Sequence, residues 1–330
     1  MIRTSVFAIA LVLSSAAVAQ KDAPAGDAPT NEQKAEAAKP NPDQVKASVE
    51  EDAQPVQRSV PFHGRTLSYI ATPGHLTIRN DKGEPIASMF YVAYTIPTRA
   101  QRRPVTFLFN GGPGSSTMWL HMGSFGPMKV DASRPETIPG PPFRYGPNPD
   151  TLLDVSDLVF IDAPTTGLSR EVGKTEPKDL FGVDKDLDAF ARTIQRYLTK
   201  YQRWNDPKFI IGESYGTTRA AGLSDKLLDA GVQLNGITFM STVFNFADLF
   251  GGEQSMIGFL PTYAADAWYF DKIPDKPPLE EFLQQARDFA SGPYAQALQK
   301  GNAIGDAEKQ SIAQQMAHFI GLSPGYILKS

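Results

Sequence analysis

Ser214 stands in the segment 212–216, GESYG, which has the pattern G-x-S-x-G. An apolar run of strand length, 209–211, precedes this segment, and apolar residues recur at helical spacing after it, up to Leu228. Strand, tight turn and helix form the setting in which this pattern presents a serine hydroxyl for nucleophilic attack. The amide of Tyr215 and the positive helix N-terminus would then face the developing negative charge. The alternative is a chance match in a βα turn without chemistry.

A second chemical feature is the glycine-rich segment 110–116, NGGPGSS, which directly follows an apolar run at 105–109. Glycines at the end of a strand leave backbone amides open to a cavity, because no Cβ shields them. A hydrolase that uses the serine turn needs a second amide donor from such a strand–helix loop. Two such motifs, each after its own strand and in this order, favour catalysis over a Gly/Pro turn without chemistry.

The surrounding elements fit this arrangement. Residues 181–204 carry apolar side chains at spacings of three and four, which predicts an amphipathic helix. Runs without alternation predict strands covered on both faces, as in a parallel sheet flanked by helices: 105–109, 158–161, 209–211 and 237–240. Alternating runs separated by turn residues at Pro73-Gly74 and 81–83 predict an antiparallel meander: 65–71, 75–79 and 86–96. Antiparallel strands leading into βαβ units, with the serine turn late in the series, describe an α/β fold of the α/β-hydrolase type.

The chain divides into four stretches. Residues 1–19 combine an early arginine, an apolar run and an A-x-A-like cleavage site, which predicts a secretory signal peptide, with a retained anchor as the alternative. Residues 20–58, rich in Ala, Pro and charge, predict a disordered linker. Residues 59–247 form the predicted hydrolase core. Residues 248–330 read as a helical cap or insertion, with helices at 279–289, 294–298 and 307–320.

Composition excludes several classes of function. The 330 residues are 41% hydrophobic, which is enough for a large core, and the net charge of -4 without a basic run argues against a nucleic-acid partner. The absence of cysteine excludes disulfides and a thiol nucleophile. No histidine or carboxylate cluster has metal-ligand spacing, so neither a metal nor another cofactor is expected. No segment after the signal peptide is long and apolar enough to span a membrane.

Three segments together resemble the serine carboxypeptidase family of α/β-hydrolases, and the resemblance runs from about residue 62 to the end. They are FLFNGGPGSSTMW, LVFIDAPTTGLSR and FIIGESYGTTRAA, while FLPTYAADAWYF is similar to the bacterial branch. The resemblance implies that Ser214 is the nucleophile. It also implies that the amides of Gly112 and Tyr215 form the oxyanion hole, and that Asn110 and Glu213 hold the terminal carboxylate of a peptide substrate.

The sequence departs from the family pattern in two places. The family pairs the residue equivalent to Glu213 with a second glutamate, whose aligned position is Ser124 here. Recognition of a substrate C-terminus and an acidic pH optimum are therefore open. The cysteine that follows the family's glycine run is replaced by Ser115, which fits a version without disulfides.

The general base of such an enzyme is not evident. In this fold the order is serine, acid, histidine, and His318 is the sole histidine after Ser214. The apolar stripe of its helix leaves His318 on the exposed side, so we expect no catalytic role for it. We expect local structural roles for His121 and Asp162, and none of Asp248, Asp266 and Asp271 follows a recognisable strand. The resemblance implies that the acid and base lie beyond residue 330, so we expect this chain to be an N-terminal portion.

Three functions follow from these observations. The first is an exported, periplasmic or secreted serine carboxypeptidase-like hydrolase, which removes C-terminal residues from peptides through an acyl-enzyme on Ser214. The second keeps the fold but carries out ester hydrolysis or acyl transfer, as the serine at position 124 suggests. The third is a non-catalytic binding protein, if the chain truly ends at residue 330. Side-chain preference and oligomeric state are not predicted.

Overall fold

The computed structural model describes residues 47–97, 102–131, 141–246 and 252–329. Its centre is a mixed sheet with the strand order β1-β2-β3-β7-β4-β9-β10, and β8 pairs with β3 beside this path. Strands β1, β2 and β3 pair antiparallel, whereas β7, β4, β9 and β10 run parallel to one another. The strands of this sheet are β1 Val56–Phe62, β2 Arg65–Arg79, β3 Pro85–Thr95, β4 Val105–Phe109, β7 Asp157–Ile161, β8 Arg170–Glu171, β9 Lys208–Glu213 and β10 Gly236–Met240. The predicted α/β class, with antiparallel strands before parallel ones, is confirmed.

The register of the parallel strands decides where the two chemical motifs lie. Strands β4 and β9 are direct neighbours, and Phe109 at the end of β4 pairs with Gly212 near the end of β9. All residues of β4 and of β7 are buried, as expected for strands covered on both faces. Because parallel strands end at the same edge of the sheet, the glycine-rich loop and the serine turn leave the sheet side by side.

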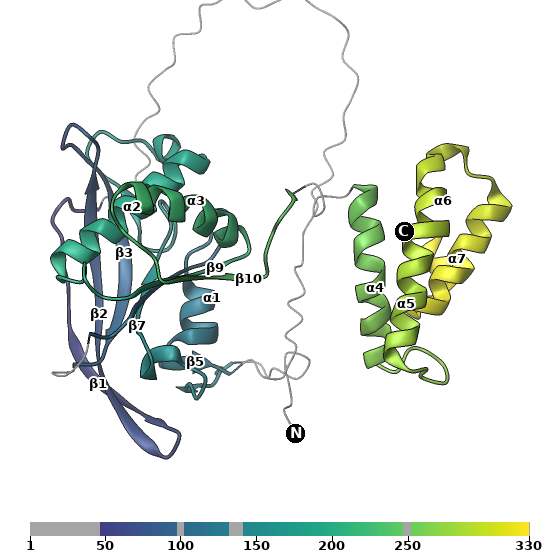
Figure 1. The fold of residues 1–330 in the computed structure, drawn as a ribbon, viewed down its shortest axis with the longest axis horizontal. Coiled ribbons are helices and arrows are strands. Elements are labelled where there is room, and N and C mark those ends of the chain that lie inside the picture. Colours follow the sequence, from purple (N-terminus) through teal and green to yellow (C-terminus); the bar gives the residue numbers. More distant parts are fainter. Residues whose placement is uncertain (1–46, 98–101, 132–140, 247–251, 330) are drawn as a thin grey trace, which may run out of the picture. The chain divides into compact units, whose positions relative to one another are not determined.

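Helices cover both faces of the sheet (Figure 1). On one face, α2 Val183–Lys200 and α3 Tyr215–Asp229 bury residues such as Phe190, Ile194 and Leu223 against the strands. The amphipathic helix predicted at 181–204 is therefore present, shortened by a few residues at each end. A smaller set of elements lies on the other face: α1 Met118–Leu120, η1 His121–Phe125, η3 Leu152–Asp154 and the β5–β6 hairpin, Met128–Val130 and Tyr145–Pro147. A further short helix, η4, spans Pro177–Leu180.

The C-terminal region is helical and has an apolar core of its own, which includes Leu260, Phe282 and Phe319. Its elements are α4 Glu253–Tyr269, α5 Leu279–Phe289, η6 Ala290–Tyr294, α6 Ala295–Lys300, η7 Gly301–Ala303, α7 Asp306–Ile320 and α8 Pro324–Ile327. The helices predicted at 279–289 and 307–320 are confirmed, and the one predicted at 294–298 corresponds to α6. The role of this region as a cap stays a prediction. Among the residues that the structure describes, no helix is long and apolar enough to cross a bilayer.

The predicted turn at Pro73-Gly74 is wrong, because β2 continues through both residues. Pro73 pairs with Val92 and Gly74 with Tyr91 of β3. On the other side of β2 the chain segment before β1 comes very close, and a Cβ on Gly74 would lie 2.5 Å from the carbonyl oxygen of Asp52. Glycine is here a site of close backbone approach within a strand, which a sequence pattern does not separate from a turn.

Within the predicted linker, the described structure begins at residue 47, ahead of the predicted start of the core at residue 59. Residues 20–46 of the predicted linker and the predicted signal peptide lie outside the described residues, but 47–58 are held against the sheet. Strand β1 begins at Val56, Ala53 bridges to Gly74, and Glu51 binds helix α2. Composition alone misplaced this boundary because the segment is fixed by ionic and backbone bonds rather than by large apolar side chains.

Glu51 gives the N-terminal segment a pH-dependent attachment. Its carboxylate accepts hydrogen bonds from Arg196, at 2.6 and 2.8 Å, and from Lys200 at 3.2 Å. Burial raises the pKa of Glu51, but the hydrogen bonds and charges of Arg196 and Lys200 outweigh it, so that the pKa lies below its ordinary value. A carboxyl group whose pKa is lowered by folding stabilises the folded state above its unfolded pKa, and this stability is lost as the pH falls.

We therefore expect Glu51→Gln to lower the free energy of unfolding by about 1 kcal/mol at pH 7, and by progressively less as the pH falls below the ordinary glutamate pKa of about 4.3, because the unfolded chain then binds the proton before the folded state does. Urea denaturation at pH 7 and pH 3.5 measures both differences. A loss of stability that is the same at the two pH values would show that the charge of Glu51 is not the cause.

At the amino ends of the parallel strands, a buried carboxylate joins two arginines. The side chain of Asp157, 4% exposed, accepts bonds of 2.9 Å from Nε of Arg103 and from Nη1 of Arg203. Arg203 also donates through Nη2 to the carbonyl oxygen of Arg103, at 2.9 Å. This cluster lies at the end of the strands opposite to the two chemical motifs, because Asp157 is the first residue of β7 and pairs with Val105, the first of β4.

Candidate active site

Ser214 occupies the tight turn between β9 and α3. Its backbone angles, φ 57° and ψ −123°, are unusual for a residue other than glycine, so the turn is strained. The turn is fixed by its neighbours: the amide of Ser214 donates to the carbonyl oxygen of Met240 at 2.9 Å, and Thr217 donates to the carbonyl oxygen of Ser214 through its amide and hydroxyl, at 2.9 and 2.7 Å. Ser214 is half-buried.

Both glycines of the serine turn are required by packing. A Cβ on Gly212 would lie 2.0 Å from the carbonyl oxygen of Gly216, and a Cβ on Gly216 would lie 2.9 Å from the carbonyl oxygen of Phe109. The close approach of α3 to β9 and to the end of β4 therefore depends on the two missing side chains. This is the sharp strand–turn–helix geometry expected of the motif.

The glycine-rich loop after β4 touches the serine turn directly. A Cβ on Gly111 would lie 2.4 Å from the amide nitrogen of Tyr215 and 2.6 Å from the carbonyl oxygen of Glu213. The next residue, Gly112, has φ +113°, a conformation that L side chains rarely adopt. The structure therefore brings the loop that contains Gly112 against the turn of Ser214 and Tyr215, which lies about 100 residues later in the sequence.

Two amides of this assembly are free to bind an incoming group. The carbonyl oxygen of Gly111 accepts the amide of Ser115 at 3.2 Å, so the amide of Gly112, on the same planar peptide, points the opposite way. The amide of Tyr215 belongs to the first residue of α3 and has no partner within the helix. Within the described residues neither amide donates a hydrogen bond.

Asn110 and Glu213 are in direct contact, as their proposed shared role requires. Nδ2 of Asn110 donates to Oε2 of Glu213 at 3.0 Å, and Oδ1 of Asn110 accepts the amide of Leu120 at 3.0 Å. Glu213 is half-buried, whereas Asn110 is only 2% exposed. The second Nδ2 hydrogen of Asn110 has no hydrogen-bond partner among the described residues.

Arg219 is a site component that sequence reasoning missed. Its side chain is fully buried, its Nε and Nη2 donate to the carboxylate of Asp186 at 2.6 and 3.0 Å, and its Nη1 donates to the carbonyl oxygen of Asn110 at 2.7 Å. One signal could have found it: Arg219 falls on the apolar stripe of its helix, four residues after Tyr215 and four before Leu223. A charged residue at a core position needs a buried partner.

Asp162 anchors the far end of the glycine-rich loop. Its Oδ1 accepts the amide of Thr117 at 2.8 Å, and its Oδ2 accepts the amide of Leu168 at 3.2 Å. Burial raises the pKa of Asp162, and the two backbone hydrogen bonds oppose this rise. The hydroxyl of Thr117 donates to the carbonyl oxygen of Ile161, which joins the same loop to β7. These bonds agree with the structural role predicted for Asp162.

No histidine is placed as a base for Ser214 among the described residues. Nε2 of His121 lies 2.6 Å from the hydroxyl of Tyr94, and the imidazole stacks on Phe160. Burial lowers the pKa of His121 to about 4, so the ring is neutral near pH 7. His318 lies exposed on α7 and contacts Phe282 and Phe319. Both observations agree with the structural expectations for these residues.

The remaining carboxylates named from the sequence give no catalytic acid among the described residues. Asp271 is paired with Lys276, and Asp266 lies within α4, while Asp248 is outside the described residues. Ser124 lies half-buried in η1, and its carbonyl oxygen accepts a bond from Asn148.

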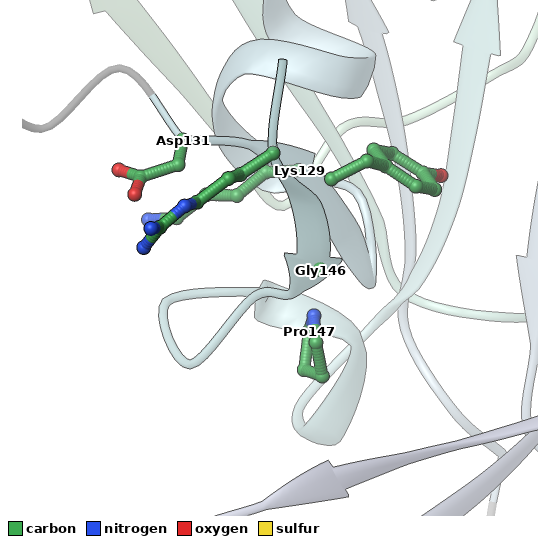
Figure 2. Close-up of a pocket in the computed structure, with 6 residues that line it drawn as sticks. Lys129, Asp131, Gly146 and Pro147 are labelled. Atoms are coloured by element: carbon green, nitrogen blue, oxygen red, sulfur yellow. The ribbon is translucent and has the colours of Figure 1, made fainter. Parts of the chain in front are cut away.

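Figure 2 shows an open hollow at the β5–β6 hairpin. It is lined by Lys129, Asp131 and the segment 144–147. Lys129 already binds Asp150 at 2.7 Å, and none of the lining residues belongs to the serine turn or to the glycine-rich loop. The hollow therefore contributes nothing to the chemistry of Ser214.

Comparisons with known proteins find several chains that are similar to this one. The chain is 33% identical over 101 residues to the pheromone-processing carboxypeptidase KEX1 of Saccharomyces cerevisiae strain S288c, a match that covers 30% of this chain and 13% of the yeast protein. The solved structure of Kex1(delta)p, a prohormone-processing carboxypeptidase from the same yeast, is similar with a TM-score of 0.47 and 18% identity over 76% of this chain and 53% of that chain. A proline iminopeptidase from Mycobacterium smegmatis is similar with a TM-score of 0.31 and 14% identity, over 75% and 69% of the two chains.

The family model for serine carboxypeptidase matches residues 63–248, which is more than half of the chain and contains both chemical motifs. The chain therefore belongs to the serine carboxypeptidase family.

Proposed function

We propose that this chain supplies the nucleophile and the oxyanion site of a serine-type hydrolase. One observation carries the proposal: Gly111 lies in backbone contact with the amide of Tyr215, so the amides of Gly112 and Tyr215 flank the strained turn that presents Ser214. Two preorganised amide donors at a strand–helix turn are what the developing oxyanion of acyl transfer requires.

The reaction would run through an acyl-enzyme. Oγ of Ser214 attacks the scissile carbonyl carbon, its proton passes to a general base, and the carbonyl oxygen becomes an anion held by the two amides. Collapse of this intermediate breaks the C–N bond while the base returns its proton to the departing amine, and the acyl group stays on Ser214 as an ester. Attack by water on the ester then frees Ser214. The general base is not among the residues that the structure describes beside Ser214.

The substrate class we favour is a peptide with a free C-terminus. Asn110 keeps one amide hydrogen free beside Glu213, at the edge of the sheet where the serine turn lies. Hydrogen bonds from such donors to a carboxylate are stronger than those between neutral groups. Ser124, where the family has a second acid, favours ester hydrolysis or acyl transfer as the second candidate.

The two candidate activities can be distinguished by assaying the full-length protein with a peptide and with the same peptide amidated at its C-terminus. Loss of charge-assisted bonds to the substrate carboxylate is expected to lower kcat/KM for the amide about 10- to 100-fold. Equal kcat/KM values for the two peptides, together with faster cleavage of an ester, would favour the second candidate. Absence of any Ser214-dependent reaction would leave the non-catalytic binding protein as the explanation.

We also propose that the protein is exported, to the periplasm or out of the cell, on the basis of the signal-peptide pattern at residues 1–19. N-terminal sequencing of the mature protein tests this. A chain that still begins at Met1 would contradict cleavage.

A further inference from the structure

We infer that Arg219 is a positioning residue: it fixes the orientation of the glycine-rich loop 110–116, here called the oxyanion loop, and Asp186 in turn fixes the orientation of Arg219. The inference rests on the proposed function, because it assigns Arg219 to the same oxyanion site. Among the described residues, Arg219 makes no hydrogen bond to Ser214. It acts through the backbone of Asn110, the residue that begins the glycine-rich loop.

The peptide between Asn110 and Gly111 is held at both of its polar ends. Its carbonyl oxygen accepts Nη1 of Arg219 at 2.7 Å, and its amide nitrogen lies 3.5 Å from Oε2 of Glu213. The next peptide carries the Gly112 amide, and its carbonyl oxygen is held by Ser115. A planar peptide held at its carbonyl has little freedom to rotate. The direction of the Gly112 amide therefore follows from the bond of Arg219 to the carbonyl oxygen of Asn110 and the bond of Ser115 to the carbonyl oxygen of Gly111.

The surroundings of Arg219 show why an arginine is needed. Asp186 receives two parallel bonds from Nε and Nη2, which leaves Nη1 aimed at Asn110. The guanidinium carbon also lies 4.4 Å from the ring centre of Phe190 and 5.3 Å from that of Tyr215, so aromatic rings restrict its motion. A lysine keeps the charge but has no planar fork, and cannot make the paired bonds to Asp186 in this geometry.

The competing explanation is that Arg219 and Asp186 form a structural ion pair without influence on the reaction. The chain contains a matched control for this possibility. Arg203 is also largely buried, binds Asp157 and donates to a backbone carbonyl oxygen, but at the opposite end of the strands. Loss of either arginine should destabilise the fold, whereas only loss of Arg219 releases the oxyanion loop.

The experiment compares Arg219→Lys, Asp186→Asn and Arg203→Met with the wild type, in the full-length protein and at a temperature where each variant is folded by circular dichroism. Steady-state hydrolysis of a peptide substrate gives kcat and KM separately. We expect Arg219→Lys and Asp186→Asn to lower kcat about 10- to 100-fold with KM changed less than about threefold, because a misplaced donor loses transition-state binding rather than substrate binding. Arg203→Met should keep kcat within about threefold.

Two results would overturn the inference: a kcat within about threefold of wild type for both folded Arg219→Lys and Asp186→Asn, or an equal loss in Arg203→Met. The additional variant Ser214→Ala distinguishes failure of the proposed function. If hydrolysis persists in Ser214→Ala, then the proposed function has failed. If Ser214→Ala abolishes hydrolysis but Arg219→Lys has the kcat of the wild type, then the positioning role alone has failed.

Discussion

Ser214→Ala is expected to lower kcat for peptide hydrolysis at least about 10⁴-fold, because no acyl-enzyme forms without the hydroxyl. The fold should remain intact, since the turn is held through the backbone of Ser214 and through Thr217, which the substitution leaves in place. Initial rates, with covalent labelling by a fluorophosphonate as a second readout, measure the effect in the full-length protein.

Ser224→Ala is the matched control for this prediction. Ser224 lies on the same helix, α3, and its hydroxyl donates to the carbonyl oxygen of Ala221 at 2.6 Å. This variant should retain wild-type rate and labelling. Undiminished labelling of Ser214→Ala would remove Ser214 as the nucleophile, whatever the rate of hydrolysis.

Gly111→Ala is expected to lower kcat about 10²- to 10³-fold, the loss associated with one oxyanion donor. The added methyl would lie 2.4 Å from the amide nitrogen of Tyr215 and 2.8 Å from that of Gly216, and backbone atoms cannot rotate aside. The loop and the serine turn must therefore move apart, which separates the two amide donors. We also expect a loss of about 1–3 kcal/mol in the free energy of unfolding, as for other overpacked sites.

Gly146→Ala provides the comparison. A Cβ on Gly146, in the β5–β6 hairpin, has no neighbouring atom within 4 Å, so this variant should keep both its stability and its rate. Denaturant unfolding and steady-state kinetics on the two variants test the prediction together. Wild-type kcat in Gly111→Ala would mean that the loop does not need its contact with the turn.

Much of the site could be predicted from the sequence because its parts are local. The buried runs ending at Phe109 and Ile211 predict parallel strands, and the glycines after each run predict turns whose amides are open. Their juxtaposition follows from the tendency of parallel strands to end at one edge, and the pairing of Phe109 with Gly212 shows it. The family resemblance predicts a shared role for Asn110 and Glu213, and in the structure the two side chains are in contact.

The rest depends on contacts between distant residues. Arg219 and Asp186 lie on different helices, and no short pattern links them to each other or to Asn110. Pro73 and Gly74 carry a local turn signal that is overridden by pairing with β3 and by the approach of Asp52. The attachment of Glu51 to Arg196 joins residues 145 positions apart, so composition gave the wrong end for the linker.

The central claim is that the amides of Gly112 and Tyr215 hold the oxyanion formed at Ser214. A crystal structure of the full-length protein with a phosphonate bound to Ser214 tests it most directly, because the phosphoryl oxygen occupies the place of the oxyanion. The account predicts this oxygen about 2.7–3.1 Å from both amide nitrogens. A phosphoryl oxygen that faces solvent or binds other donors, or an adduct on another residue, would contradict it.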